Sequence, residues 1–343
     1  MTLADFWFIL IAVLWIGYFF LEGFDFGVGN LLPVLGRTED DRRLMINTIG
    51  PVWDGNEVWL LVAGGATFAA FPNWYATLFS GFYLALLVIL LALILRGVAF
   101  EYRGKVDSDV WRARWDWAIF FGSVLPSVLW GVAFGNIVHG VPINASGTYT
   151  GSFFTLLNPY ALLAGLVTAG LFTTHGATYL ALKTSGDLRN RAHALMPLLG
   201  LVTAVLAVVF LGWTLLTAGE PVTWVTSVVA AAALLGAIAM NRAGRDGWSF
   251  ILTGVTIAFA VTTLFVTLFP DVMPSSTDPA YSLTVVNASS THYTLKVMTV
   301  VALIFTPIVL AYQAWTFWVF RRRLSTSDLP PDAGRQVETA ASS

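Results

Sequence analysis

The chain is a succession of long apolar stretches separated by short polar segments. Nine of them have about the 20 residues that a helix needs to cross the hydrocarbon core of a bilayer. They lie at 5–32, 52–71, 75–96, 116–138, 159–182, 193–217, 222–240, 248–270 and 295–320. Proline, asparagine, glycine or charged residues mark their ends, as expected at helix boundaries. The pattern therefore predicts an all-α integral membrane protein with nine transmembrane helices.

Basic residues lie on alternate connections between these stretches. Of the 18 Lys and Arg residues, all but Lys296 fall near the connections after the first, third, fifth and seventh stretches, or in the C-terminal tail. Positively charged loops stay in the cytoplasm. We therefore expect the N-terminus outside and the C-terminus in the cytoplasm. Residues 1–323 are predicted to form a single polytopic membrane domain, and 324–343 a disordered cytoplasmic tail, because that segment is rich in Ser, Asp, Pro and Ala.

Composition agrees with a lipid environment. Hydrophobic residues make up 57% of the 343 residues and charged residues only 11%, against about 25% charged residues in an average soluble domain. The net charge is −2, with no basic face that would suit nucleic acid. The chain has no cysteine, which excludes disulfides and thiolate metal sites.

Four carboxylates inside or beside the first two stretches are the candidate functional residues. Glu22 and Asp25 lie three residues apart in the first stretch, and Asp54 and Glu57 three apart at the start of the second. Residues at this spacing share a helical face. An acid at the centre of a membrane helix costs about 2.5–3.5 kcal/mol on insertion scales and commonly marks function. Because two close carboxylates cannot both ionise easily in a low dielectric, the pairs predict a proton path that loads from the cytoplasm.

Two structural interpretations compete with a proton path. The acids can pair with Arg96 or Arg103 and simply fix helix packing, and Asp54 and Glu57 also suit the first turn of a helix, where the dipole favours acids. The spacing of Gly23 and Gly27 favours close helix packing over ligand binding.

The histidines do not form a haem or metal site in sequence. The four are His139, His175, His193 and His292, and only His175 is clearly inside an apolar stretch. No two are spaced for ligation of one haem by a single helix. We therefore expect no metal site and no haem held by strong axial ligands of this chain.

Motifs along nearly the whole chain resemble those of subunit II of cytochrome bd-type quinol oxidases. They are the runs Glu22–Gly29, Arg42–Asn47, Trp53–Trp59, Phe79–Tyr83, Arg96–Arg103, Trp115–Trp117, Gly131–Asn136, Leu157–Pro159, Gly176–Tyr179 and Phe269–Ser276. The resemblance implies a supporting subunit of a bacterial plasma-membrane (inner-membrane) enzyme that oxidises quinol, menaquinol or ubiquinol, and reduces dioxygen to water in the respiratory chain.

The resemblance also implies partners and site residues. The obligate partner would be subunit I, which carries haem b and haem d, and small accessory subunits, membrane lipids and quinone would complete the assembly. Asp54 matches the position of the aspartate that the family uses for proton uptake, with Glu57, Asp25 and Glu22 beside it. The family commonly has Asp where Glu22 stands. Arg96 and Trp53 would lie at an interface near the partner's haems.

A stand-alone proton-coupled transporter is the alternative function. Such proteins also carry carboxylates at helix breaks inside the membrane, but their folds are built from inverted repeats. The sequence shows no clear repeat. A co-purifying chain with haem ligands would distinguish the two functions.

Overall fold

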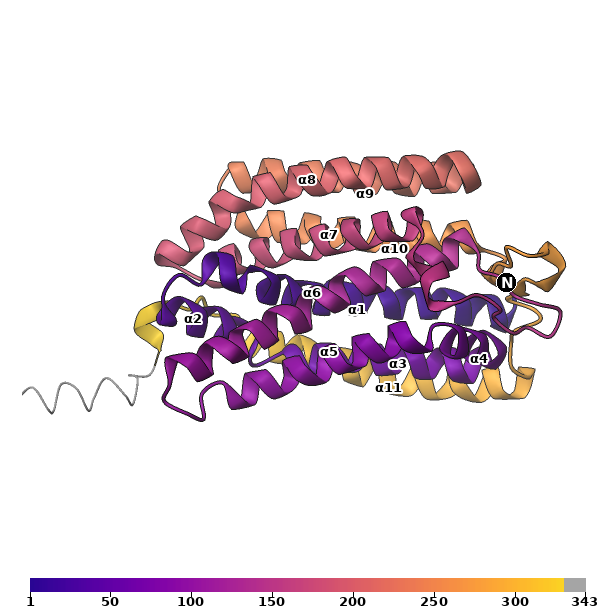
Figure 1. Cartoon of the computed structure of the whole chain (residues 1–343), viewed down its shortest axis with the longest axis horizontal. Coiled ribbons are helices and arrows are strands. Elements are labelled where there is room, and N and C mark those ends of the chain that lie inside the picture. Colours follow the sequence, from indigo (N-terminus) through magenta and orange to yellow (C-terminus); the bar gives the residue numbers. More distant parts are fainter. Residues whose placement is uncertain (330–343) are drawn as a thin grey trace, which may run out of the picture.

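The computed structural model describes residues 1–329, and all but the first six residues of the predicted disordered tail lie outside that range. Eleven α-helices account for most of the described chain (Figure 1). They are α1 (Leu3–Leu35), α2 (Glu39–Ile49), α3 (Trp53–Ala70), α4 (Pro72–Gly81), α5 (Tyr83–Tyr102), α6 (Asp109–His139), α7 (Pro159–Lys183), α8 (Gly186–Ala218), α9 (Pro221–Arg242), α10 (Asp246–Leu268) and α11 (His292–Val319). The short elements are η1 (Phe153–Leu157), β1 (Asp271–Met273), η2 (Pro279–Tyr281), β2 (Leu283–Thr284) and η3 (Thr326–Asp328).

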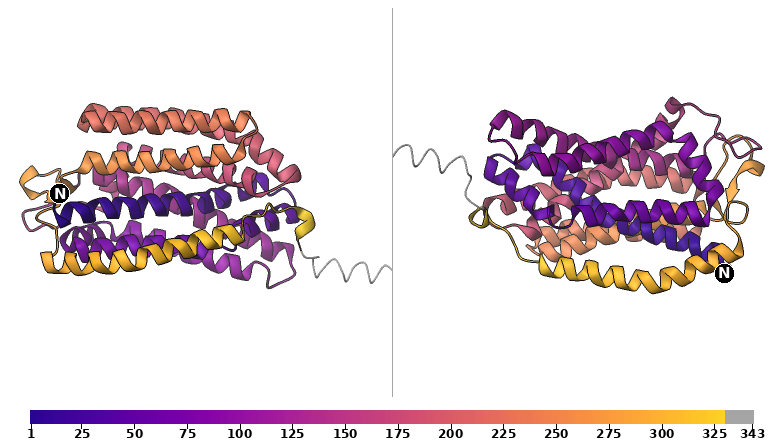
Figure 2. Two further views of the ribbon diagram at one scale, coloured as in Figure 1. Left: turned by 180° about the vertical axis from the view of Figure 1, so that it is seen from behind. Right: turned by 90° about the horizontal axis from the view of Figure 1, so that it is seen from below.

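The long helices run side by side, with α1 at the centre of the bundle (Figure 1). Helix α1 packs against α3, α6, α7 and α10, and 20 of its residues are buried. Helices α8 and α9 form an outer pair on one side, and α11 lies along another edge (Figure 2). In α11 only Leu295 is buried. The N-terminus and η3 lie at opposite ends of the bundle (Figure 1).

Eight helices of the described chain are long and apolar enough to cross a membrane. They correspond to eight of the nine predicted stretches. The remaining stretch, 52–71, forms α3, an 18-residue helix that carries Asp54, Asn56 and Glu57 in its first turns. At 1.5 Å per residue α3 spans about 27 Å, close to the roughly 30 Å hydrocarbon core. The all-α membrane fold is thus confirmed, while the ninth crossing stays a prediction.

The structure differs from the predicted elements in two places. The predicted helix at 75–96 is interrupted at Phe82, where α4 ends and α5 begins. A Cβ on Gly81 would lie 2.7 Å from Tyr149, so the break lies where the loop between α6 and α7 packs onto the end of α4. Helix α2 was not predicted, because it is short and carries acids and arginines rather than an apolar stretch.

Glycines set the close crossing of α1 and α7. A Cβ on Gly27 would lie 2.0 Å from the carbonyl oxygen of Phe172 and 2.7 Å from the Cα of Gly176. A Cβ on Gly23 would lie 2.8 Å from the ring of Phe172. Only a residue without a side chain lets two backbones approach so closely. The prediction that Gly23 and Gly27 serve helix packing is confirmed.

Candidate functional site

Glu22 of α1 and Arg96 of α5 form an ion pair in the interior of the bundle. Nη1 of Arg96 donates to Oε1 of Glu22, and the side chains are 1% and 0% exposed for arginine and glutamate. The Arg96 guanidinium also lies over the rings of Phe26 and Phe100, 4.7 and 5.3 Å from their centroids. A charge enclosed by apolar side chains is tolerable only when it is paired, so the pair holds α1 and α5 together.

Asp25, one turn further along α1, belongs to a second polar group. Nδ2 of Asn56 donates to Oδ2 of Asp25 at 2.7 Å, and both side chains are fully buried. Gln313 of α11 continues this group, since its Nε2 donates to Oδ1 of Asn56 at 3.3 Å. Nε1 of Trp59 in turn donates to Oε1 of Gln313 at 2.8 Å. A chain of hydrogen bonds therefore links Asp25 of α1 through α3 to α11.

Several buried polar atoms of these groups make no hydrogen bond within residues 1–329. They are Oε2 of Glu22, Oδ1 of Asp25, and Nε and Nη2 of Arg96. Buried polar atoms in proteins are normally satisfied, by protein or by ordered water. The site therefore retains hydrogen-bonding capacity, which a proton path made of carboxylates and water needs.

Asp54 and Glu57 occupy different surroundings on α3. Asp54 is exposed, and its Oδ1 accepts from the backbone N–H of Gly55 at 2.8 Å. Glu57 is half-buried. Within the first turns of α3, Asp54 thus lies at the surface of this chain while Asn56 reaches the buried Asp25.

The structure places Arg96 and Trp53 at different depths. Arg96 is enclosed by this chain, so its guanidinium does not reach the surface. The half-buried Trp53 packs on the ring of Phe100, with centroids 5.1 Å apart. Phe100 therefore contacts both Trp53 and Arg96.

Ion pairs fix the ends of the helices near α2. Arg103 binds Glu39 of α2 and Asp116 of α6, at 2.8 and 2.6 Å. Burial alone would lower the pKa of the Arg103 guanidinium, but these two carboxylates outweigh it and raise that pKa. Arg191 binds Asp41 at 2.7 Å. Burial alone would raise the pKa of the Asp41 carboxyl, but the hydrogen bonds from Arg191 and Thr38 outweigh it and lower that pKa.

His175 is a packing residue. It is fully buried, its Nδ1 lies 2.7 Å from Oγ1 of Thr253, and its Nε2 lies 3.2 Å from the carbonyl oxygen of Phe20. Both ring nitrogens are thus engaged, which leaves neither for a haem iron. Within residues 1–329, no group of three or more His, Asp or Glu side chains is arranged to hold a metal ion.

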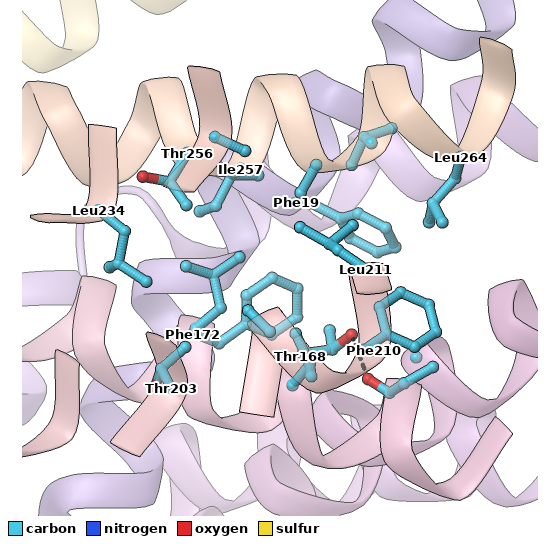
Figure 3. A pocket seen from close by; sticks show the side chains of 18 of the residues that line it. Phe19, Thr168, Phe172, Thr203, Phe210, Leu211, Leu234, Thr256, Ile257 and Leu264 are labelled. Atoms are coloured by element: carbon cyan, nitrogen blue, oxygen red, sulfur yellow. Dashed lines mark hydrogen bonds between the residues drawn. The ribbon is translucent and has the colours of Figure 1, made fainter. Parts of the chain in front are cut away.

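An apolar cavity of about 140 Å³ lies between the α8–α9 pair and the central helices (Figure 3). Phe19, Phe172 and Leu234 are among its walls. The hydroxyls of Thr168 and Thr256 donate to carbonyls of their own helices, each at 2.9 Å. No residue that lines the cavity is ionisable, so the cavity is separate from the polar groups around Glu22 and Asp25.

The sequence analysis did not predict the roles of Asn56 and Gln313 in the polar group around Asp25. Asn56 lies inside a motif that is notable for its acids, and Gln313 lies in an apolar stretch 257 residues away. A signal was present for Gln313, since an amide in a membrane helix commonly finds a partner on another helix. Which residue is its partner, however, depends on how α11 packs against α3, and the sequence does not show that packing.

The geometry defines a class: a polytopic helical membrane protein with an ionisable cluster enclosed between its central helices. Comparison with known proteins gives the family. The model of the cytochrome bd terminal oxidase subunit II family matches residues 3–320. The chain belongs to this family, and is thus a supporting subunit of a respiratory quinol oxidase in the bacterial cytoplasmic membrane.

Individual relatives agree with this assignment. The chain is 47% identical over 329 residues to cytochrome bd ubiquinol oxidase subunit 2 of Bacillus subtilis, covering 94% of this chain and 97% of that protein. It is 41% identical to cytochrome bd-I ubiquinol oxidase subunit 2 of Escherichia coli K12, covering 94% and 95%. A chain in the structure of bd oxidase from Geobacillus thermodenitrificans shares the fold, with a TM-score of 0.76 at 17% identity over 93% of this chain and 99% of that one. Nothing in these comparisons supports the transporter alternative.

Proposed function

We propose that this chain conducts protons from the cytoplasm toward the oxygen-reducing centre of the oxidase, with Asp54 as the entry group. Glu57, Asp25 and Glu22 would extend the path inward. Haem b and haem d would be held by subunit I, whose oxidation of quinol supplies the electrons. Reduction of dioxygen to water consumes protons, so a centre beneath a hydrophobic barrier needs protonatable groups that lead to it.

The observation that carries this proposal is the contrast between Asp54 and Asp25. Asp54 is exposed at the start of α3. Asp25 of α1 is fully buried, and it accepts a hydrogen bond from Asn56, which also belongs to α3. Ionisable groups within membrane helices are rare and tend to mark ion pathways. Buried polar atoms of Glu22, Asp25 and Arg96 make no hydrogen bond within residues 1–329, and water bound to them would connect the acids.

We propose that the exposed face of α3 is covered by subunit I. Asp54, Val58, Leu61 and Gly65 recur at helical spacing and are all exposed. A Cβ on Gly65 would meet nothing within 4 Å in this chain. Small residues favour close helix contacts in membranes, and an acid facing lipid is costly. A partner helix on this face would shield Asp54 from lipid and bring it next to the haem-bearing subunit.

We further propose nine membrane crossings, with the N-terminus outside and the C-terminus in the cytoplasm. The opposite positions of the N-terminus and η3 in the bundle support an odd number of crossings. The basic residues around α2 support a cytoplasmic location for that end. Small accessory subunits and bound quinone belong to the same proposal.

The test is the substitution Asp54→Asn in the complex with subunit I. Asparagine keeps the size and hydrogen bonding of the side chain but cannot carry a proton as a carboxylic acid does. We expect normal haem content and at least about a tenfold loss of quinol-driven oxygen consumption per haem, equivalent to about 1.4 kcal/mol on the barrier. Asp187→Asn, which removes an 81% exposed acid at the same end of the bundle, is the control. Normal turnover per haem in Asp54→Asn would leave Asp54 a packing residue.

A further inference from the structure

A second and larger cavity, of about 860 Å³, opens beside the inner end of α11. Helices α1, α2, α7, α10 and α11 line it, together with residues 324, 325, 328 and 329. None of the residues in the inner half of α11 is buried, since Leu295 at the opposite end is the helix's one buried residue. The cavity is therefore the space between a loosely packed helix end and the central bundle, and it is separate from the polar cluster around Asp25.

The floor of this cavity is aromatic. Phe20 and Phe24 of α1, Phe250 of α10 and Phe317 of α11 all line it. Their rings contact one another, with centroids 5.6 Å apart for Phe20 and Phe250 and 6.3 Å apart for Phe24 and Phe317. A floor of this kind is suited to a hydrocarbon chain, because it offers apolar area and no unpaired polar group.

The rim of the cavity is cationic. Lys183, Arg321, Arg322 and Arg323 line it, with Asp328 as the one carboxylate. Lys183 donates to the carbonyls of Phe320 and Arg322, which fixes the end of α11. Arg323 lies 3.5 Å from the buried carboxylate of Asp246. Lys183 and Arg323 thus contact distant parts of the chain, whereas Arg321 and Arg322 are exposed and contact only residues close in sequence.

The two exposed arginines have only local partners. Arg321 stacks on the ring of Trp318 at 4.4 Å and donates to the Trp318 carbonyl. Arg322 pairs with Asp328 at 2.8 Å, with its own side chain 80% exposed. An exposed ion pair of this kind is weak, so Arg322 can exchange Asp328 for a stronger anion. The guanidinium fork suits the oxygens of a phosphate.

We propose that this cavity binds an anionic phospholipid, with an acyl chain along the aromatic floor and the phosphate at Arg321 and Arg322. In the proposed orientation the site lies in the cytoplasmic leaflet, where basic pockets between membrane helices bind acidic headgroups. The apolar floor and cationic rim together match an amphiphile with a negative head. Residues 330–343 do not match the aromatic floor, because that segment is mostly small or polar and has no long apolar side chain. The bound lipid would fill the gap beside α11 and hold the helix against the bundle.

The test uses the purified complex with subunit I, stripped of lipid and titrated with phosphatidylglycerol or phosphatidylcholine under native mass spectrometry. We expect phosphatidylglycerol to bind and raise the thermal unfolding midpoint, and phosphatidylcholine to bind far more weakly. Each rim arginine contributes roughly a fivefold factor toward an anionic headgroup, so Arg321→Gln/Arg322→Gln should weaken binding about 30-fold. Arg242→Gln/Arg245→Gln removes two exposed arginines at the same end but outside the cavity, and should bind as the unaltered complex does. Haem absorbance reports whether each variant has assembled.

Four results would overturn the proposal. They are equal binding of the two lipids, unchanged binding in Arg321→Gln/Arg322→Gln, equal losses in the two double variants, and the same stabilisation by inorganic phosphate alone. The last result would show a phosphate site that makes no use of the aromatic floor. Tighter lipid binding by a chain that ends at Leu329 would be a fifth contrary result, because it would show that the protein's own tail occupies the cavity.

Discussion

Glu22 and Arg96 form an ion pair in which neither side chain is more than 1% exposed. The pair joins the central helix α1 to α5 at a depth where either charge alone would be costly. Asp25 does not share this partner, because it accepts a hydrogen bond from Asn56. The two acids of this motif thus have different partners, and can be tested separately.

Breaking the Glu22–Arg96 pair from one side should prevent assembly. Removing one member of a buried ion pair costs about 3–5 kcal/mol, because the other charge is left uncompensated. We expect Glu22→Gln and Arg96→Met each to lower the yield of haem-containing complex severely. The double variant Glu22→Gln/Arg96→Met should recover much of that yield, since no lone charge remains.

The double variant also separates packing from proton transfer. If Glu22 belongs to the path, the assembled double variant should consume oxygen per haem about tenfold more slowly than the unaltered complex. Full turnover per haem would show that the pair serves packing alone.

A methyl group at position 27 should disrupt the crossing of α1 and α7. The Cβ of Gly27→Ala would meet backbone atoms of Phe172 and Gly176, which cannot move aside as a flexible side chain can. We expect overpacking to cost about 1–3 kcal/mol or more, seen as a lower unfolding midpoint and less assembled complex. Gly50→Ala is the control, because beyond its neighbours in the chain the nearest atom to its Cβ would be 3.5 Å away. Equal stability of the two variants would contradict the close crossing.

Reporter fusions test the number of crossings. A reporter joined after Arg323 should be active in the cytoplasm, and one inserted near Ser146 should be active outside, as expected from the distribution of basic residues. Because nine crossings place the ends of the chain on opposite sides, a reporter at the N-terminus should also be external. Finding both ends on one side would mean that α3 does not cross the membrane.

Asp41 should stabilise the fold through its bond with Arg191. Asp41→Asn removes a charge-assisted hydrogen bond from a carboxylate that is 11% exposed, and should cost about 1–3 kcal/mol. Asp187→Asn removes a second partner of Arg191 that is 81% exposed, and should cost less than about 1 kcal/mol. Thermal unfolding of the two variants at pH 7 makes the comparison.

The effect of Asp41 should depend on pH in one direction. The folded-state pKa of Asp41 is lowered, so its contribution is fully present above the unfolded value of about 3.9 and is lost as pH falls through the folded value. The difference in stability between the unaltered chain and Asp41→Asn should therefore shrink below about pH 4. A difference that grew in acid would mean that Arg191 does not stabilise the ionised carboxylate.

Apolar length and charge placement by themselves determined most of the architecture. Eight predicted spans are helices of the structure, because a chain in lipid must satisfy its backbone hydrogen bonds within each segment. The spacing of Gly23 and Gly27 likewise indicated close packing, because a glycine can serve a helix contact wherever its partner lies. Motifs spread along the whole chain were sufficient to indicate the family.

Only the tertiary structure decided which polar groups meet. Glu22 and Arg96 are 74 residues apart, and Asn56 and Gln313 are 257 residues apart. Their pairing depends on how α1, α3, α5 and α11 pack, which local sequence does not encode. The same reason explains why Asp54 is exposed while Asp25, in an equally acidic motif, is buried. Spacing within a helix determines a shared face, but burial and partners are set by the helices that cover that face.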